Sequence, residues 1–200
     1  MTRHIMKRLA AIGLVSLAAP ALAAGDPVSG QKKAEVCASC HGPQGISQAP
    51  NFPILAGQYS DYIERALKDY RSGERDNAIM KGFAANLSDA DIRDLAAWFS
   101  SQSGLSGPAN QSALRRRVRQ LRPKTCSGCH GIPGMRNAYP VYRVPKLRGQ
   151  HAQYLIDALT AYKQGTRAHP TMQAQVAHLT DQDIAELAGI FARSGKPKDK

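Results

Sequence analysis

Cys37-Ala38-Ser39-Cys40-His41 and Cys126-Ser127-Gly128-Cys129-His130 are two copies of one pentapeptide pattern, and together they use every cysteine of the 200-residue chain. In C-x-x-C-H, the two thiols can add to the vinyl groups of a haem, and the adjacent imidazole can bind its iron. Two complete copies therefore predict two covalently bound haem c groups. We expect Cys37, Cys40, Cys126 and Cys129 to be the covalent anchors, with His41 and His130 as the proximal iron ligands.

Other uses of four cysteines are possible in principle. They could form two disulfides, hold zinc in two C-x-x-C pairs, or include a thiol redox pair. None of these alternatives explains why a histidine follows the second cysteine in both copies. Haem attachment is therefore the preferred interpretation.

The first 23 residues are predicted to be a cleavable signal peptide. A basic start precedes a short apolar stretch at 9–17, and Ala21-Leu22-Ala23 matches the A-x-A cleavage pattern. The apolar stretch is too short to cross a bilayer, and no later segment reaches the length required. An uncleaved anchor is the alternative. We expect the mature protein to be soluble and periplasmic.

The charge of the chain is strongly basic. The full sequence carries 27 Lys and Arg against 15 Asp and Glu, a net charge of +12. The segment up to Ala24 holds three bases and no acid, which leaves 24 − 15 = +9 for the mature polypeptide. Such a surface attracts acidic protein partners or an anionic membrane surface. A solvated basic surface without a target is the alternative, and we expect no nucleic-acid partner.

The chain contains an internal repeat. Leu55-Ala56-Gly57-Gln58 matches Leu147-Arg148-Gly149-Gln150 at an offset of 92, whereas the haem motifs are 89 apart, so three residues are inserted in between. The same offset pairs Tyr62, Leu67, Tyr70, Gly73, Arg75, Asp89, Asp91, Ile92, Leu95 and Phe99 with Tyr154, Leu159, Tyr162, Gly165, Arg167, Asp181, Asp183, Ile184, Leu187 and Phe191. A repeat of this size predicts two small domains, at 24–104 and 114–200, joined by a linker at 105–113.

Each half is predicted to be helical. Residues 59–72 place apolar side chains on one helical face, and Gly73 ends that helix. Ser88 with Asp91 forms a capping-box pattern before an apolar stripe, and Thr180 with Asp183 repeats it. No stretch alternates convincingly as a strand. Because halves of this size rarely fold on their own core, we expect each to need its haem as a staple.

The distal side of each iron calls for a sixth ligand. Met80 lies 39 residues after His41 and Met172 lies 42 after His130, and the two methionines align in the repeat. Both are the predicted distal ligands, with ordinary core packing as the alternative. Met135 follows His130 too closely to reach across the ring. His169 is the competing ligand in the second half, although we expect surface positions for it and for two further histidines that break the repeat, His151 and His178.

These features resemble the dihaem cytochrome c4 family. The resemblance rests on the paired haem motifs, the segment 51–58, the tyrosine-rich helix and a methionine before Asn86-Leu87-Ser88-Asp89. It implies an all-α protein of two tandem cytochrome-c-like domains related by pseudo-twofold symmetry. It also implies a periplasmic, sometimes membrane-associated, carrier of single electrons to a cbb3-type haem–copper terminal oxidase, with no organic substrate and no enzymatic activity. Pro53 and Pro145 match the proline whose carbonyl orients the proximal imidazole.

Some parts of the chain depart from that pattern. Residues 139–144 replace a shorter loop of the first half, and the run 115–122 contains five arginines. This run could be a docking patch for an acidic partner or a solvated helix face. Two other functions stay open on the sequence. One is a small dihaem peroxidase or sulfur-oxidising haem enzyme, and the other is a cytochrome subunit of a periplasmic dehydrogenase.

Haem content is the first testable consequence of the paired motifs. For the chain expressed with a haem-attachment system, we expect the mass of the mature polypeptide plus two haem groups. Mass spectrometry of the denatured protein measures this, because only a covalently bound haem stays with the chain. A Cys126→Ala and Cys129→Ala double variant should carry one haem. A single haem in the unmodified protein would contradict the interpretation.

Overall fold

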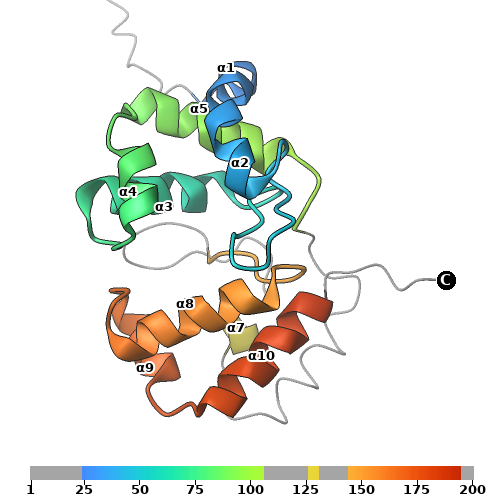
Figure 1. The fold of residues 1–200 in the computed structure, drawn as a ribbon, viewed down its shortest axis with the longest axis vertical. Helices are drawn as coiled ribbons and strands as arrows, with labels where there is room; N and C mark the ends of the chain where they lie inside the picture. Colours follow the sequence, from blue (N-terminus) through green and yellow to red (C-terminus); the bar gives the residue numbers. More distant parts are fainter. Residues whose placement is uncertain (1–23, 106–125, 131–143, 195–200) are drawn as a thin grey trace, which may run out of the picture.

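The computed structural model describes residues 24–105, 126–130 and 144–194 as two helical halves, one above the other along the longest axis (Figure 1). The first half contains α1 (Pro27–Lys33), a 3-10 helix (Ala34–Cys37), α2 (Ala38–His41), α3 (Ser60–Ser72), α4 (Ala78–Ala84) and α5 (Asp89–Ser101). The second contains α7 (Cys126–His130), α8 (Ala152–Gln164), α9 (Pro170–Val176) and α10 (Asp181–Arg193). These residues include no strand beyond an isolated bridge between Arg75 and Arg167, which confirms the all-α prediction.

Helix α5 is the centre of the first half, because α1 and α3 both pack against it. Its apolar face contributes Leu95, Ala96 and Phe99 to a core that Ala34 and Ile63 complete, and each of the five is at most 5% exposed. Burying a side chain of leucine or phenylalanine size contributes about 1.5–3 kcal/mol. This core therefore holds the elements on which the first haem motif lies.

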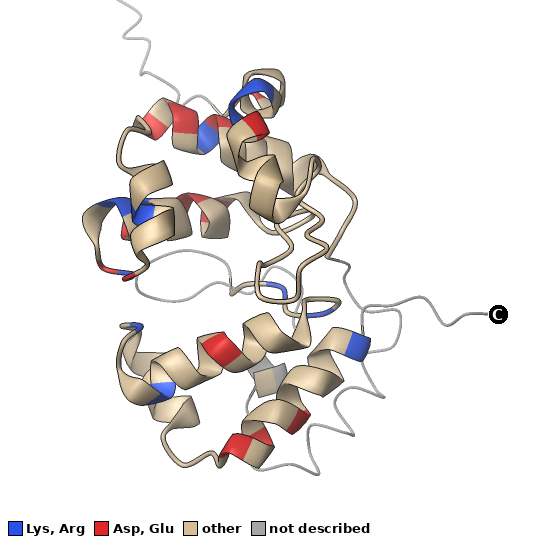
Figure 2. Ribbon diagram, viewed as in Figure 1, with Lys and Arg blue, Asp and Glu red and all other residues tan. Residues whose placement is uncertain are grey.

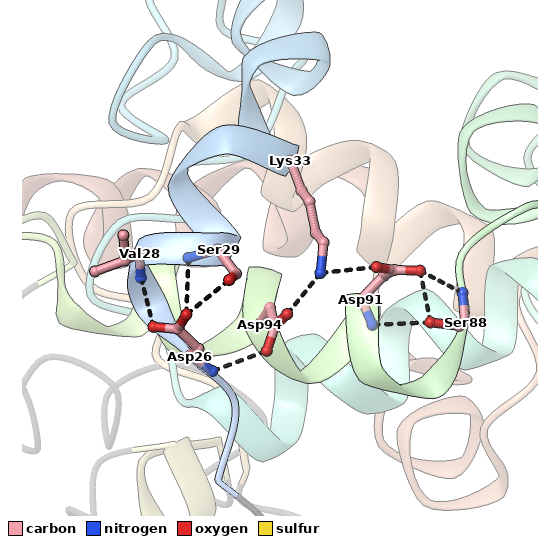
Figure 3. Close-up of polar contacts among 7 residues, drawn as sticks. All are labelled: Asp26, Val28, Ser29, Lys33, Ser88, Asp91 and Asp94. Carbon is pink, nitrogen blue, oxygen red and sulfur yellow. Dashed lines mark hydrogen bonds and ion pairs between the residues drawn. The ribbon is translucent and has the colours of Figure 1, made fainter.

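A lysine joins α1 to α5 (Figure 3). Lys33 Nζ lies 2.8 Å from Asp91 Oδ1 and 2.6 Å from Asp94 Oδ2. Asp91 also belongs to the capping box with Ser88, and Asp94 accepts a hydrogen bond of 2.8 Å from the backbone N–H of Asp26. One cation thus fixes the helix that precedes the first haem motif to the helix that centres the core.

The second half repeats the design with α8 and α10 packed together. One buried cluster contains Leu155 and Phe191, and a second contains Val176 and Leu187. Cys126, the first residue of α7, packs against both clusters. The second haem motif therefore contacts the same core that holds the helices together.

The predicted helix ends are confirmed. Ser88 and Asp91 form the capping box of α5, and Thr180 and Asp183 form that of α10. Helices α3 and α8 end at glycines in the left-handed region, of which Gly73 has φ 86°. That conformation is strained for any residue with a Cβ, which explains why the repeat has glycine at both positions.

Helices α1, α4 and α9 are among those that were not predicted from the sequence. Helix α1 is capped by Asp26, whose side chain accepts from the N–H groups of Val28 and Ser29. Helices α4 and α9 have seven residues each and carry Met80 and Met172. Helices this short are stabilised by their caps and by packing against the rest of the protein. Their sequences therefore show too little apolar periodicity to predict a helix.

The two halves meet through reciprocal hydrogen bonds. Gln58 Nε2 donates to the carbonyl of Lys146 and its Oε1 accepts from the Lys146 N–H, at 3.0 and 2.9 Å. Gln150 does the same with Ile54, at 3.0 and 2.9 Å. Reciprocal contacts between equivalent residues are the signature of a twofold axis. They support the pseudo-twofold arrangement that the family resemblance implies.

Several predictions concern segments outside the described residues: the signal peptide, nearly all of the linker, the arginine-rich run 115–122, Met135, and residues 139–143. Among the described helices, none combines the length and the apolar character that a membrane span requires.

The lysine bridge predicts a pH-dependent stability. Hydrogen bonds from Lys33 lower the pKa of Asp91 and of Asp94 below the ordinary carboxyl value. A carboxyl whose pKa is lowered by folding stabilises the protein above its unfolded pKa and loses this effect as pH falls through the folded pKa. We expect Lys33→Met to lower the thermal midpoint of the holoprotein at pH 7, with a smaller difference from wild type at pH 3. Lys32→Met, at an exposed position of the same helix, is the control. Equal midpoints for Lys33→Met and wild type at pH 7 would contradict this role.

Candidate haem-binding sites

Each C-x-x-C-H motif is folded as helical turns. In the first half, Cys37 ends the 3-10 helix, and Cys40 and His41 belong to α2. In the second half the whole motif forms α7. Residues three and four positions apart share one face of a helix, so the spacing brings both thiols and the imidazole to the same side. This is the arrangement that a haem held by two thioethers and an axial imidazole requires.

A proline carbonyl orients each imidazole. His41 Nδ1 lies 2.9 Å from the carbonyl oxygen of Pro53, and His130 Nδ1 lies 2.9 Å from that of Pro145. A carbonyl oxygen only accepts hydrogen bonds, so in both rings Nδ1 carries the proton and donates it. Nε2 consequently keeps its lone pair for the iron. These contacts confirm the role predicted for the two prolines.

Burial favours the neutral form of both rings. It lowers the pKa of His41 and of His130, in each case more than the hydrogen bond to proline raises it. The His41 side chain is 6% exposed and lies edge-on to Phe52, with 6.2 Å between ring centroids. Neutral imidazole is the form that binds iron. The surroundings of both histidines therefore suit axial ligation.

The alternatives to haem find little support. No disulfide joins the four cysteines, all of which lie in the described part. The same part contains no cluster of three or more His, Cys, Asp or Glu side chains suited to hold a zinc ion. Burial raises the pKa of Cys37 and of Cys126, whereas a reactive thiol pair needs a lowered one. The residues present fit covalent haem.

Met80 lies on α4 behind an asparagine cap. The Asn77 side chain accepts a hydrogen bond of 2.9 Å from the Met80 backbone N–H. Asn77 thereby fixes the first turn of the helix and the position from which the thioether extends. The methionine side chain is half-buried. Its assignment as distal ligand stays a prediction.

Met172 occupies the matching place on α9. Here His169 is the cap, and its Nδ1 accepts a hydrogen bond of 3.3 Å from the Met172 N–H. Met172 also packs against the cluster of Val176 and Leu187 that Cys126 contacts. The anchor and the predicted distal ligand of the second half therefore share one apolar core. His169 occupies the position equivalent to Asn77 of the first half. Like Asn77, it accepts a hydrogen bond from the backbone N–H of the methionine three residues later.

The structure corrects the surface positions predicted for two histidines. His169 is half-buried as the cap of α9. His151 is also half-buried, and its Nε2 lies 2.9 Å from the carbonyl oxygen of Ser47 in the other half. His178 is exposed, as predicted. His169 deviates because a histidine can replace asparagine as a helix cap. His151 deviates because its ring reaches a backbone carbonyl at the domain boundary.

Sequence reasoning missed a group of side chains between the halves. Arg75 Nη2 donates to the hydroxyl of Tyr154 at 3.1 Å, and Arg167 Nη2 donates to that of Tyr62 at 3.2 Å. Each guanidinium also lies over a tyrosine ring of its own half, 4.5 Å from the Tyr70 centroid and 4.4 Å from that of Tyr162. We call these six residues the interface Arg–Tyr cluster. All six match in the repeat, which was the only signal in the sequence.

Comparisons with known proteins agree with this geometry. The cytochrome c family model matches the chain twice, over residues 28–103 and 116–189. Cytochrome c4 of Pseudomonas aeruginosa is 40% identical, covering 96% of this chain and 98% of that protein. Cytochrome c4 of Azotobacter vinelandii is 36% identical with the same coverage. The crystal structure of reduced recombinant cytochrome c4 from Pseudomonas stutzeri matches with a TM-score of 0.71 at 35% identity, covering 84% of this chain and 98% of that one.

The distal ligands can be tested by substitution. We expect Met80→Ala to keep its haem, since the thioether bonds are untouched, but to bind carbon monoxide when reduced and to have a lower potential at that haem. Met172→Ala should do the same at the second haem. Absorption spectra before and after carbon monoxide, together with the ferric methionine charge-transfer band, measure this.

His169→Asn is the matched control, because asparagine is the natural cap at the equivalent position of the first half. This variant should keep the charge-transfer band of both haems. An unchanged second haem in Met172→Ala, together with an altered one in His169→Asn, would assign the distal position to His169 instead.

Proposed function

The chain belongs to the cytochrome c family and, within it, to the dihaem cytochromes c4, and from this we propose that it delivers single electrons to a cbb3-type haem–copper terminal oxidase. The observation that carries the proposal is the duplicated site. Each half combines a C-x-x-C-H turn, an imidazole oriented by a proline carbonyl and a methionine on a capped helix. The chain is an electron-transfer protein with two covalently bound haem c groups, and it is not an enzyme.

The protein residues determine what chemistry reaches the iron. A bound haem c supplies an iron that alternates between the ferric and ferrous states. We propose that the imidazoles of His41 and His130 and the thioethers of Met80 and Met172 would hold the two haem irons. With these ligands in place, small molecules would be kept from the iron and electron transfer would be outer-sphere. A thioether ligand also raises the potential relative to a second imidazole.

The hydrogen bonding of His169 supports Met172 as the second distal ligand. Nδ1 of this ring accepts from the Met172 N–H. In a neutral ring the proton then resides on Nε2, so neither nitrogen offers a free lone pair. Ligation by His169 would require it to give up the cap of α9. Ligation by Met172 leaves that cap in place.

We place this function in the periplasm. The predicted signal peptide at 1–23 supports export, and the basic charge of the mature chain permits association with an anionic membrane surface. The partners of such a carrier are redox proteins: a respiratory donor and the terminal oxidase.

The charge of the mature chain is divided unequally between its halves. Residues 24–105 contain 8 Lys and Arg and 10 Asp and Glu, a net charge of −2, whereas residues 106–200 contain 16 and 5, a net charge of +11. In Figure 2 the described ribbon of the second half shows few basic segments, because most of its basic residues lie outside the described residues. We propose that the arginine run 115–122 in this half docks an acidic surface of the oxidase.

Two relatives favour a sulfur-oxidising enzyme, in place of a respiratory complex, as the electron donor. Proteins named thiosulfate dehydrogenase electron acceptor, from Stutzerimonas stutzeri and Thiomonas intermedia, are 34% and 32% identical and cover 82% and 92% of this chain. We propose a periplasmic sulfur-oxidising dehydrogenase as the alternative donor. Rapid reduction of the ferric protein by thiosulfate dehydrogenase and thiosulfate would support it. Reduction no faster than without the dehydrogenase would exclude it.

Electron delivery to the oxidase should slow as ionic strength rises, because salt screens the attraction of a +9 carrier to an acidic surface. Stopped-flow oxidation of the reduced protein by the purified oxidase, at two ionic strengths, measures the effect. Replacing Arg115, Arg116, Arg117 and Arg119 by glutamine should reduce the salt dependence and leave both potentials nearly unchanged.

The matched control is a variant with four other basic residues of the same half replaced by glutamine, which removes the same charge elsewhere. It should retain most of the salt dependence. Equal effects of both variants would show that net charge matters and the arginine run does not. Oxidation rates that do not depend on salt would contradict electrostatic docking altogether.

A further inference from the structure

Arg148 is a buried arginine whose charge is not compensated. It lies on the segment between the second haem motif and α8, and it is only 3% exposed. Its Nε and Nη1 are both buried and reach no hydrogen-bond acceptor. Among the ion pairs of the described residues, none includes this side chain. A guanidinium has five N–H donors and a permanent positive charge, so the second half contains a buried cation with donors to spare.

The acidic side chains of the described second half are placed elsewhere. Asp157 accepts a hydrogen bond of 2.8 Å within α8, and Asp183 belongs to the capping box of α10. Asp181 forms an ion pair of 3.0 Å with a lysine. Glu186 is exposed to solvent, whereas Arg148 is buried. The carboxylates of this half therefore do not supply the missing negative charge.

The last turn of α10 does not supply it either. The backbone N–H of Gly149, the residue after Arg148, donates to the carbonyl of Phe191 at 3.1 Å. The N–H and the hydroxyl of Ser194 donate to the same oxygen, at 3.3 and 2.8 Å. This carbonyl therefore already has three donors. The dipole of a helix attracts a cation to its C-terminus, but it is equivalent to only about half an elementary charge. Part of the positive charge of Arg148 thus stays uncompensated.

The first half has an alanine at the equivalent position. Ala56 matches Arg148 at the offset of 92 and is fully buried. The backbone of Gly104 passes directly over it, so close that a Cβ at Gly104 would lie 2.4 Å from the Ala56 Cβ. A longer side chain at position 56 has no room there. The buried cation is therefore a feature of the second half alone.

The chemistry of an uncompensated guanidinium identifies the class of ligand that it binds. Leaving a buried charge unpaired costs free energy. Burial lowers the pKa of Arg148, but an arginine stays protonated in proteins, so the site cannot avoid the cost by losing its proton. A water molecule would offer an acceptor without a charge. An anion offers both, and a hydrogen bond between charged groups is stronger than one between neutral groups.

We propose that Arg148 binds a small dissolved anion, such as chloride, beside the segment that supports the second haem. A small ion suits a side chain that is almost fully buried. The neighbouring Leu147 packs against the same cluster as Cys126, and the carbonyl of Pro145 contacts His130. An anion at Arg148 should therefore favour the ferric state of the second haem, because reduction adds a negative charge. The inference goes beyond the proposed function and does not depend on the partner that the carrier serves.

The test uses the full holoprotein, with chloride replacing gluconate at constant ionic strength. Thermal unfolding and spectroelectrochemical titration measure the thermal midpoint and both potentials. In wild type we expect chloride to raise the thermal midpoint, because a ligand of the folded state stabilises it. Chloride should also lower the potential of the second haem and leave the first unchanged. Arg148→Met should lose both responses. The matched control Lys163→Met, which removes a cation that Asp181 already pairs, should keep them.

Arg148→Lys keeps the test informative if methionine disturbs folding, because it retains the charge and should retain a weaker response to chloride. A wild-type protein that does not respond to chloride would overturn the proposal. A response that persists in Arg148→Met would overturn it as well, since the anion would then bind elsewhere. A carboxylate of the haem is the other source of negative charge. In that case Arg148→Met would change the second potential while wild type ignores chloride, and the dissolved anion would be excluded. Electron delivery to the oxidase does not enter these equilibrium measurements.

Discussion

Covalent attachment of haem is the constraint on which the rest of this structure depends. A domain of about 80 residues gains only about 3–5 kcal/mol from a single apolar core. The elements that carry the predicted ligands are short, with four residues in α2, five in α7 and seven in α4 and α9. Isolated helices of this length do not persist in water. Cys37 and Cys126 pack against the buried clusters of their halves, so the thioether bonds fasten the macrocycle to the same core that holds the long helices.

The second level of organisation is the twofold relation between the halves. A duplicated domain could leave its copies independent, but here Gln58 and Gln150 each use both ends of the side-chain amide on backbone of the other half. An amide pairs with a peptide group in this way only at one distance and orientation. These contacts fix one half against the other. Arg75 and Arg167, which precede Met80 and Met172 in the chain, also contact tyrosines across this boundary.

The sequence was sufficient to predict those parts of the structure that depend on interactions between residues close in the chain. The capping boxes of α5 and α10 and the glycine after α3 follow from side chains close in the chain, and the haem motifs follow from spacing alone. The proline contacts of His41 and His130 depended on a family resemblance, because nothing local points to a carbonyl 12 or 15 residues away. The role of Arg75 and Arg167 was not predicted. Their identity in both halves was visible, but a repeat shows that a residue matters and does not show what it contacts.

The places where the repeat fails mark what the two halves do differently. At a cap, replacing Asn77 by His169 changes the side chain and keeps the backbone contact, so the predicted ligand remains in register. Other differences between the halves change the side chains that are exposed to a partner protein. Ile79 and Phe83 on α4 are 62% and 47% exposed, whereas the matching residues Thr171 and Gln175 on α9 are polar. The predicted iron ligands are thus duplicated, whereas these surface residues are not. A carrier that exchanges electrons with two different proteins requires this combination. Both haem sites need the same kind of iron ligands, whereas each partner protein must recognise a different surface.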